Sequence, residues 1–222
     1  MRPLITSCER RCNDVRILIV DDHAIVRVGL KQILMEDRSD FEFGEAASAS
    51  EAFKQLAQHD WDLMLLDINL PAKNGIEILK QLRSNNRQIP VLVLSMYPED
   101  QYAIRALKAG ASGYMTKEMA PENLLDAIMK VANGGRYVSP ELAEQLAKDI
   151  QAGGSAQPHS LLTDREFEIF KLIASGNTVS EIGLELSLSV KTVSTYRTRI
   201  LSKMNLKHNA DITQYAVKHQ LV

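Results

Sequence analysis

Short runs of consecutive apolar residues recur along the first 120 residues of the chain. The run Leu63 to Leu66 is bounded by polar and turn residues, and the stretches Val15 to Val20 and Val91 to Leu94 show the same pattern. Such a run is typical of a strand that is buried on both faces, as in a parallel sheet. Weaker strand patterns cover Phe41 to Ala47 and Gly113 to Met115, which makes five candidate strands.

Segments with apolar residues at helical spacing separate these strands. The expected helices cover about Ala24 to Met35, Ser50 to Gln58, Lys73 to Arg83, Asp100 to Ala109 and Pro121 to Asn133. In the first of them one broad apolar face is expected, formed by Ile25, Val28, Leu30, Ile33 and Leu34. Strand and helix alternating five times predict an α/β fold with a doubly wound, five-stranded parallel sheet.

Polar side chains stand at the carboxyl ends of four of these strands. Asp21 and Asp22 follow the first strand, Asp67 ends the third, Ser95 ends the fourth and Lys117 follows the fifth. Open α/β sheets bind ligands at this edge, where the strand order reverses. Each residue alone could be a helix cap, a turn residue or a solvated charge. Their shared position favours a single site.

The chemistry of these side chains points to phosphoryl transfer. Three clustered carboxylates suit a hard divalent cation, and Mg²⁺ takes about six oxygen ligands. Mg²⁺ would join Asp67 to an incoming phosphoryl group and neutralise its charge. Asp67 is then the natural nucleophile and would form an aspartyl phosphate. Lys117 and the Ser95 hydroxyl would hold the phosphoryl oxygens.

The chain changes character after this alternating region. Pro140 to Ile150 has helical spacing, and the Gly/Ser/Pro-rich stretch Gln151 to Ser160 predicts a flexible linker. At the other end, the polar tail predicts disorder, and Cys8 and Cys12 alone are a weak signal for a metal or a disulfide. We therefore expect a tail at 1–14, a first domain at 15–137, a linker with a short helix at 138–160 and a second domain at 161–222.

The second domain shows helix patterns only. Two capping boxes, Thr163 to Glu166 and Thr178 to Glu181, each precede an expected helix. The four expected helices cover Asp164 to Ser175, Val179 to Leu186, Val190 or Lys191 to Met204, and Ala210 to His219 with Asn209 as its cap. Short helices joined by tight turns predict an all-α helix-turn-helix domain.

The third helix of this domain is basic. No acidic residue occurs between Ser189 and His208, while Val193, Ile200 and Met204 belong to its apolar stripe. The opposite face combines small polar groups with positive charge, which suits base edges and phosphates. A solvated surface helix would look similar, but the missing acids and the preceding helix and turn favour DNA binding.

Composition supports two modules with different partners. The hydrophobic content of 45% and the charged content of 24% are ordinary for a globular protein. Acidic residues outnumber basic ones in 15–137, and basic residues outnumber acidic ones in 161–222. No apolar run is long enough to span a bilayer, and the start lacks the apolar core of a signal peptide. We expect a cytoplasmic location and no membrane partner.

The first domain resembles the receiver domain of two-component response regulators. The resemblance covers about Val15 to Arg136 and rests on the D-D pair, on L-L-D-I-N-L-P around Asp67, on L-S and on G-Y-M-T-K. It implies that a histidine kinase phosphorylates Asp67. It also implies that Asp22, Asp67 and the backbone carbonyl of Asn69 bind Mg²⁺, with Asp21 helping through water.

The resemblance further implies a switch, in which Ser95 moves toward the phosphate and Tyr114 changes rotamer. An amphipathic ring at the sheet edge is the alternative for Tyr114. The family often has proline after the lysine, in a cis peptide bond, whereas Glu118 follows Lys117 here. A non-proline cis bond costs about 2.5–4 kcal/mol, so the geometry of this bond stays open.

The second domain is similar to the LuxR-type helix-turn-helix, over about Leu161 to Val222. The matching motifs are L-T-x-R-E and E-I-G-x-x-L-S-L-S-V-K-T-V-S-T-Y-R-T-R-I-L-S-K-M, with Gly183 where the family usually has alanine. The resemblance implies that Ser194, Thr195 and Thr198 face bases and that the last helix makes the dimer contact. The residues implied to approach the DNA backbone are Lys191, Tyr196, Arg197, Arg199 and Lys203.

The order of the two domains resembles a NarL/FixJ-type response regulator. Phosphorylation of Asp67 would shift the chain toward a homodimer that reads two half-sites about one DNA turn apart, and RNA polymerase is a further candidate partner. One rival is a phosphohydrolase, which would need a second carboxylate two residues after the nucleophile, where Asn69 stands. The other is a DNA-binding regulator in which Asp67 is never phosphorylated. We expect a regulator and not an enzyme.

Overall fold

The computed structural model describes residues 15–37, 40–70, 73–151 and 157–222. Several expectations lie outside the described residues: the disorder of the tail, the role of Cys8 and Cys12, the centre of the linker at 152–156, and Pro71 of the motif around Asp67. None of the described helices combines the length and the apolar character that crossing a membrane requires.

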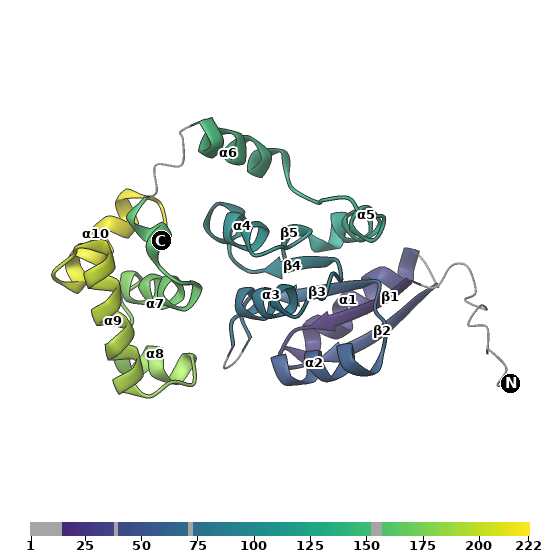
Figure 1. Cartoon of the computed structure of the whole chain (residues 1–222), viewed down its shortest axis with the longest axis horizontal. Coiled ribbons are helices and arrows are strands. Elements are labelled where there is room, and N and C mark those ends of the chain that lie inside the picture. The colour runs from purple at the N-terminus through teal and green to yellow at the C-terminus, as the bar shows by residue number, and fades with distance from the viewer. Residues whose placement is uncertain (1–14, 38–39, 71–72, 152–156) are drawn as a thin grey trace, which may run out of the picture.

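Five parallel strands form the predicted sheet in the order β2-β1-β3-β4-β5 (Figure 1). Their bounds are β1 (Val15–Val20), β2 (Phe41–Ala46), β3 (Leu63–Asp67), β4 (Val91–Ser95) and β5 (Gly113–Thr116). The order reverses between β1 and β3, which is the switch point at which ligands bind in this kind of sheet. Every residue of β3 and β4 is buried, because helices cover both faces of the sheet.

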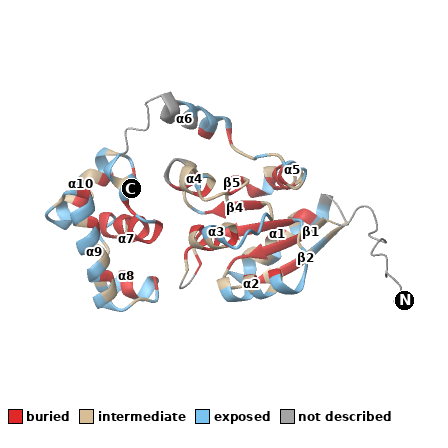
Figure 2. Ribbon diagram, viewed as in Figure 1, coloured by how far each residue is buried: buried red, intermediate tan, exposed pale blue. Residues whose placement is uncertain are grey.

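Five helices cover the two faces. They are α1 (Ala24–Asp37), α2 (Ala49–Gln58), α3 (Gly75–Ser84), α4 (Glu99–Lys108) and α5 (Ala120–Ala132). Alternate strand residues point to opposite sides, so Ile17 and Leu65 pack with α1 and α5, whereas Leu18 and Leu66 pack with α2, α3 and α4. The predicted bounds are correct to within one or two residues. Figure 2 shows the buried strands between half-exposed helices.

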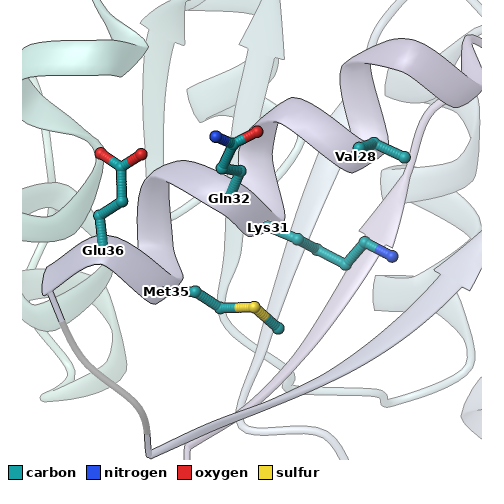
Figure 3. A pocket seen from close by; sticks show the side chains of 5 residues that line it. All are labelled: Val28, Lys31, Gln32, Met35 and Glu36. Atoms are coloured by element: carbon teal, nitrogen blue, oxygen red, sulfur yellow. The ribbon is translucent and has the colours of Figure 1, made fainter.

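Helix α1 buries less of its apolar surface than its sequence predicts. Leu30 and Leu34 are buried against the sheet, but Ile25 is 79% exposed, Val28 is 52% exposed and Met35 is 56% exposed. The predicted face was too broad, because only one side of α1 reaches the sheet. Part of the outer side lines a shallow hollow, shown in Figure 3, formed by Val28, Lys31, Gln32, Met35 and Glu36.

The helices of the second half follow the predicted pattern. They are α6 (Pro140–Gln151), α7 (Asp164–Ala174), α8 (Val179–Glu185), α9 (Val190–Met204) and α10 (Asn209–Lys218). Both predicted capping boxes are present, at Thr163 and at Thr178. The predicted cap of α10 was wrong. His208 is the N-cap, its backbone N–H donates to Asp211, and Asn209 is the first helical residue.

The end of the predicted linker is structured. Pro158–Leu161 form a short 3-10 turn, η1, where the sequence predicts flexible chain up to Ser160. Arg105 of α4 donates a hydrogen bond to the His159 carbonyl, and the His159 ring packs near Phe167 and Tyr215. These contacts offset the conformational entropy cost of ordering the turn. A glycine- and serine-rich composition could not reveal them, because they come from other parts of the chain.

Candidate functional site

Lys117 joins two carboxylates at the carboxyl edge of the sheet. Its Nζ lies 2.7 Å from Asp21 Oδ2 and 2.7 Å from Asp67 Oδ2. The strand register brings these ends together, since Val20 lies beside Leu66 and Asp67 lies beside Leu94. Asp21 and Asp67 are buried, so one ammonium group stabilises two carboxylates that water reaches poorly. The sequence predicted this convergence.

Burial and charge act in opposite directions on this cluster. Burial raises the pKa of Asp67, and the charge and hydrogen bond of Lys117 counteract only part of that rise. For Lys117, burial lowers the pKa, but attraction to Asp67 and hydrogen bonds to Asp21 and Asp67 outweigh it, and the net pKa is raised. Lys117 therefore stays charged at neutral pH beside the side chain that is the candidate nucleophile.

The same edge offers ligand atoms for a cation. One ligand atom each from Asp21, Asp22, His23 and Asp67 lies within 4.8 Å of the others. Asn69 Oδ1 is buried without a hydrogen-bond partner in the described structure, and Asp22 Oδ1 lies 2.9 Å from Nδ1 of His23. Buried oxygens are costly unless they are hydrogen-bonded or bind a cation. A donor set made mainly of oxygens fits Mg²⁺. The sequence analysis did not single out His23, although it directly follows the aspartate pair.

Ser95 and Tyr114, the two residues of the expected switch, both form a hydrogen bond with the backbone of Tyr97. The Ser95 hydroxyl accepts a hydrogen bond of 3.0 Å from the Tyr97 backbone N–H, and the Tyr114 hydroxyl donates one of 2.8 Å to the Tyr97 carbonyl. Tyr114 lies on β5, an edge strand of the sheet, and its side chain is fully buried. The described residues contain no cis peptide bond, and the bond between Lys117 and Glu118 is therefore trans.

Helices α3 and α4 contact α7 and the preceding turn, and we call this the interdomain contact (Figure 1). Arg105 donates to the carbonyls of His159 at 2.6 Å and Leu162 at 2.9 Å, and its guanidinium lies 4.2 Å from the Phe167 ring centre. Asp164 accepts a hydrogen bond of 2.6 Å from Lys80. The sequence did not reveal this contact, because its residues have no shared spacing or motif.

Aromatic rings form the centre of the interdomain contact. Tyr97 stacks on Tyr102 with 4.7 Å between ring centres, and Phe167 of α7 packs edge-on against Tyr102 at 5.3 Å. Lys171 Nζ lies 4.0 Å from the centre of the Tyr97 ring. A cation over an aromatic face is attracted by the electrons of the ring, and more strongly where water is excluded.

The predicted DNA-facing surface of α9 is open. Six of the predicted residues are exposed, namely Lys191, Ser194, Thr195, Thr198, Arg199 and Lys203, and Tyr196 is half-buried. Two of the predicted residues have partners within the domain: Arg197 donates to Asn209, and the Nζ of Lys203 lies 2.6 Å from a Glu166 oxygen. The interdomain contact is made by α7, so it leaves the exposed face of α9 uncovered.

The pKa of His159 gives a testable pH dependence. Burial, followed by the charge of Arg105 and by His219, lowers it to about 4, from an ordinary value near 6.5. Between these values the unfolded chain binds a proton that the folded chain does not, so stability falls as the pH falls through this window. We expect the midpoint of thermal unfolding, followed by circular dichroism, to decrease from pH 7 to pH 5. His159→Gln should reduce this slope; an unchanged slope would contradict the assignment.

Two family models match the chain. The response regulator receiver domain matches residues 17–129, and the luxR family of bacterial regulatory proteins matches residues 160–216. Curated relatives match both parts together. Response regulator UvrY of Escherichia coli K12 is 32% identical over 208 residues, which cover 93% of this chain and 95% of UvrY. Response regulator GacA of Pseudomonas viridiflava is 36% identical over 209 residues, which cover 94% of this chain and 98% of GacA.

Solved structures of response regulators are similar to this chain, over most of its length or over a part of it. RcsB of Salmonella enterica serovar Typhimurium, bound to the rprA promoter in the presence of the phosphomimetic BeF3⁻, is 25% identical with a TM-score of 0.61 and covers 91% of this chain and 98% of its own. A LuxR-family response regulator of Aurantimonas is 35% identical with a TM-score of 0.56, and it covers 62% of this chain and 99% of its own.

Proposed function

Because the chain belongs to the response regulators that join a receiver domain to a LuxR-type DNA-binding domain, we propose that Asp67 accepts the phosphoryl group that controls it. The observation that carries this proposal is the Lys117 ammonium, which lies 2.7 Å from both Asp21 and Asp67 beside a cluster of metal-ligating atoms. A histidine kinase would supply the phosphoryl group.

Each side chain of the pocket has a proposed role. Asp67 attacks the phosphorus atom, and Lys117 moves its hydrogen bonds from the carboxylates to the phosphoryl oxygens. Asp22 and Asp67, with the Asn69 carbonyl, would hold Mg²⁺, and Asp21 would help through water. When bound, Mg²⁺ neutralises charge on the transferred group. Without a second carboxylate at position 69, this site suits a regulator better than a phosphohydrolase.

The proposed output is binding to promoter DNA by a homodimer. Thr195 and Thr198 donate their hydroxyl protons to backbone carbonyls of α9, at 2.9 Å and 3.1 Å, so their oxygens are left to accept from base edges. Arg199 and Lys191 are exposed on the same helix and would contact phosphates. Helix α10 is the proposed dimer contact. A DNA partner implies action in the cytoplasm, where RNA polymerase would be a further partner.

Gel shifts with genomic DNA fragments test this function. We expect wild-type protein to bind more tightly after incubation with acetyl phosphate and Mg²⁺. Asp67→Asn keeps the size of the side chain but removes the nucleophilic carboxylate, and we expect its affinity to stay at the unphosphorylated level. An equal response of both proteins to acetyl phosphate would exclude Asp67 as the phosphoacceptor and would favour the regulator that is never phosphorylated there.

A further inference from the structure

His23 places a nitrogen atom beside the carboxylates of the phosphoacceptor pocket. Its Nδ1 lies 2.9 Å from Asp22 Oδ1 and 3.4 Å from Asp21 Oδ1. The His23 backbone N–H donates a hydrogen bond of 2.8 Å to the same Asp21 oxygen, which holds the residue against the pocket. Lys117 binds the other oxygen, Oδ2, of both Asp21 and Asp67. None of the proposed roles of the pocket uses the His23 nitrogen.

The spacing of these atoms suits the ligands of one metal ion. Octahedral ligands about 2.1 Å from a metal lie about 3 Å apart when adjacent and about 4.2 Å apart when opposite. One ligand atom each of Asp21, Asp22, His23 and Asp67 lies within 4.8 Å of the others. Asn69 adds a buried side-chain oxygen that has no hydrogen-bond partner in the described structure. A hydrogen bond from His23 would satisfy one carboxylate oxygen, whereas a metal ion would bind all of these groups.

We propose that His23 ligates the metal ion of the phosphoacceptor pocket and raises the preference of the pocket for borderline transition ions, such as Co²⁺, Ni²⁺ and Zn²⁺, over Mg²⁺. The proposal deepens the proposed function and rests on it for the position of the metal. Carboxylate and carbonyl oxygens suit Mg²⁺, whereas imidazole nitrogen suits the transition ions. The pocket therefore combines a set of oxygen ligands with one nitrogen ligand of different preference.

Two kinds of metal ion would compete for this one pocket. Mg²⁺ keeps several of its waters and needs only one or two carboxylates, so it can bind while the His23 ring points away. The ring has room for such a movement, because the His23 side chain is 62% exposed. A transition ion gains the bond to Nδ1 and holds the ring inward. The free concentration of that ion then sets the share of the protein that carries it in place of Mg²⁺.

Isothermal titration of Mg²⁺ and of Co²⁺ into the full-length protein tests the selectivity. Cys8 and Cys12 are replaced by serine in every protein, because their thiols bind Co²⁺ as well. His23→Asn keeps an amide N–H for Asp22 but has no imidazole. Loss of an outer-shell partner already weakens metal binding about 10–100-fold, so we expect Co²⁺ to bind this variant at least about tenfold more weakly. Its affinity for Mg²⁺ should stay within about threefold, because the oxygen ligands remain.

Two controls locate the bound ion. His59→Asn removes an exposed histidine at the end of α2 and should bind both ions like the parent protein. Asp67→Asn removes a charged ligand of the pocket and should weaken the binding of both ions. Unchanged Co²⁺ binding by Asp67→Asn, or an equal loss in His59→Asn and His23→Asn, would place Co²⁺ on other histidines and would overturn the proposal.

Pulsed electron paramagnetic resonance of bound Mn²⁺ tests ligation itself. Mn²⁺ takes the same oxygen ligands as Mg²⁺, and a directly bound imidazole nitrogen modulates its electron spin echo. We expect this nitrogen modulation in the parent protein and in His59→Asn, and its loss in His23→Asn. A histidine that only donates a hydrogen bond to Asp22 gives no such modulation, even if its replacement alters affinity.

The outcomes separate this inference from the proposed function. A parent protein that binds Mg²⁺ without nitrogen modulation, or a His23→Asn protein with an unchanged ratio of the two affinities, would overturn the role of His23 and leave phosphorylation of Asp67 intact. If Mg²⁺, Mn²⁺ and Co²⁺ all fail to bind the parent protein, the metal-assisted function proposed for the pocket fails, and the inference fails with it.

Discussion

Lys117→Met should destabilise the receiver domain by about 3 kcal/mol in metal-free buffer at neutral pH. The variant leaves Asp21 and Asp67 buried without their shared cation, and removing one partner of a buried ion pair typically costs about 3–5 kcal/mol. Urea unfolding followed by Trp61 fluorescence measures this change, because Trp61 is the single tryptophan of the chain and lies in the receiver domain.

Magnesium provides an internal check on this result. A divalent cation at the carboxylates supplies the charge that Lys117 no longer provides, so added Mg²⁺ should stabilise Lys117→Met more than the wild type. Lys54 is exposed, so the free energy of unfolding of Lys54→Met should stay within about 0.5 kcal/mol of that of the wild type. A Lys117→Met protein as stable as the wild type without metal would show that the ammonium does not hold the two carboxylates together.

Thr198→Asp should weaken binding to promoter DNA on the order of 100-fold, since it places a carboxylate on the face of α9 that we expect to lie against base edges and phosphates. Thr198 is exposed, and its hydroxyl bonds only to the Ser194 carbonyl of the same helix in the described structure, so the domain should still fold. Fluorescence anisotropy with a labelled promoter fragment at fixed salt measures the affinity.

Ser175→Asp is the matched control for this variant. Ser175 is exposed at the end of α7, outside α9, and the substitution adds the same charge to the same domain. We expect its affinity to stay within about threefold of the wild type, because a charge outside the DNA-facing surface is screened by salt. A comparable loss in both variants would mean that overall charge, and not the face of α9, governs DNA binding.

The sheet was predictable because its pattern is local. A strand whose two faces are both covered by helices needs a continuous run of apolar residues. The sequence shows this signal at Leu63 to Leu66 and at Val91 to Leu94. Amphipathic character was less informative for α1, where Ile25 and Val28 are exposed although their spacing suits a helix face against the sheet. Which part of an apolar face a sheet covers depends on helix placement, which local spacing does not encode.

The pocket was predictable for a different reason. Parallel strands bring their carboxyl ends to one edge, so Asp21, Asp67 and Lys117 could be placed together from strand order alone. The interdomain contact had no such geometric rule. Tyr97 and Lys171 lie 74 positions apart, on elements whose relative placement depends on tertiary packing. The ordered turn at Pro158–Leu161 escaped prediction for the same reason.

Mass spectrometry of the phosphorylated protein tests the central claim most directly. After incubation with acetyl phosphate and Mg²⁺, borohydride reduction converts an aspartyl phosphate to homoserine, which peptide sequencing can locate. We predict homoserine at position 67 in the wild type, and no conversion at any aspartate in Asp67→Asn. Homoserine at Asp21 or Asp22, or none in a wild-type protein whose DNA binding still responds to acetyl phosphate, would contradict the account.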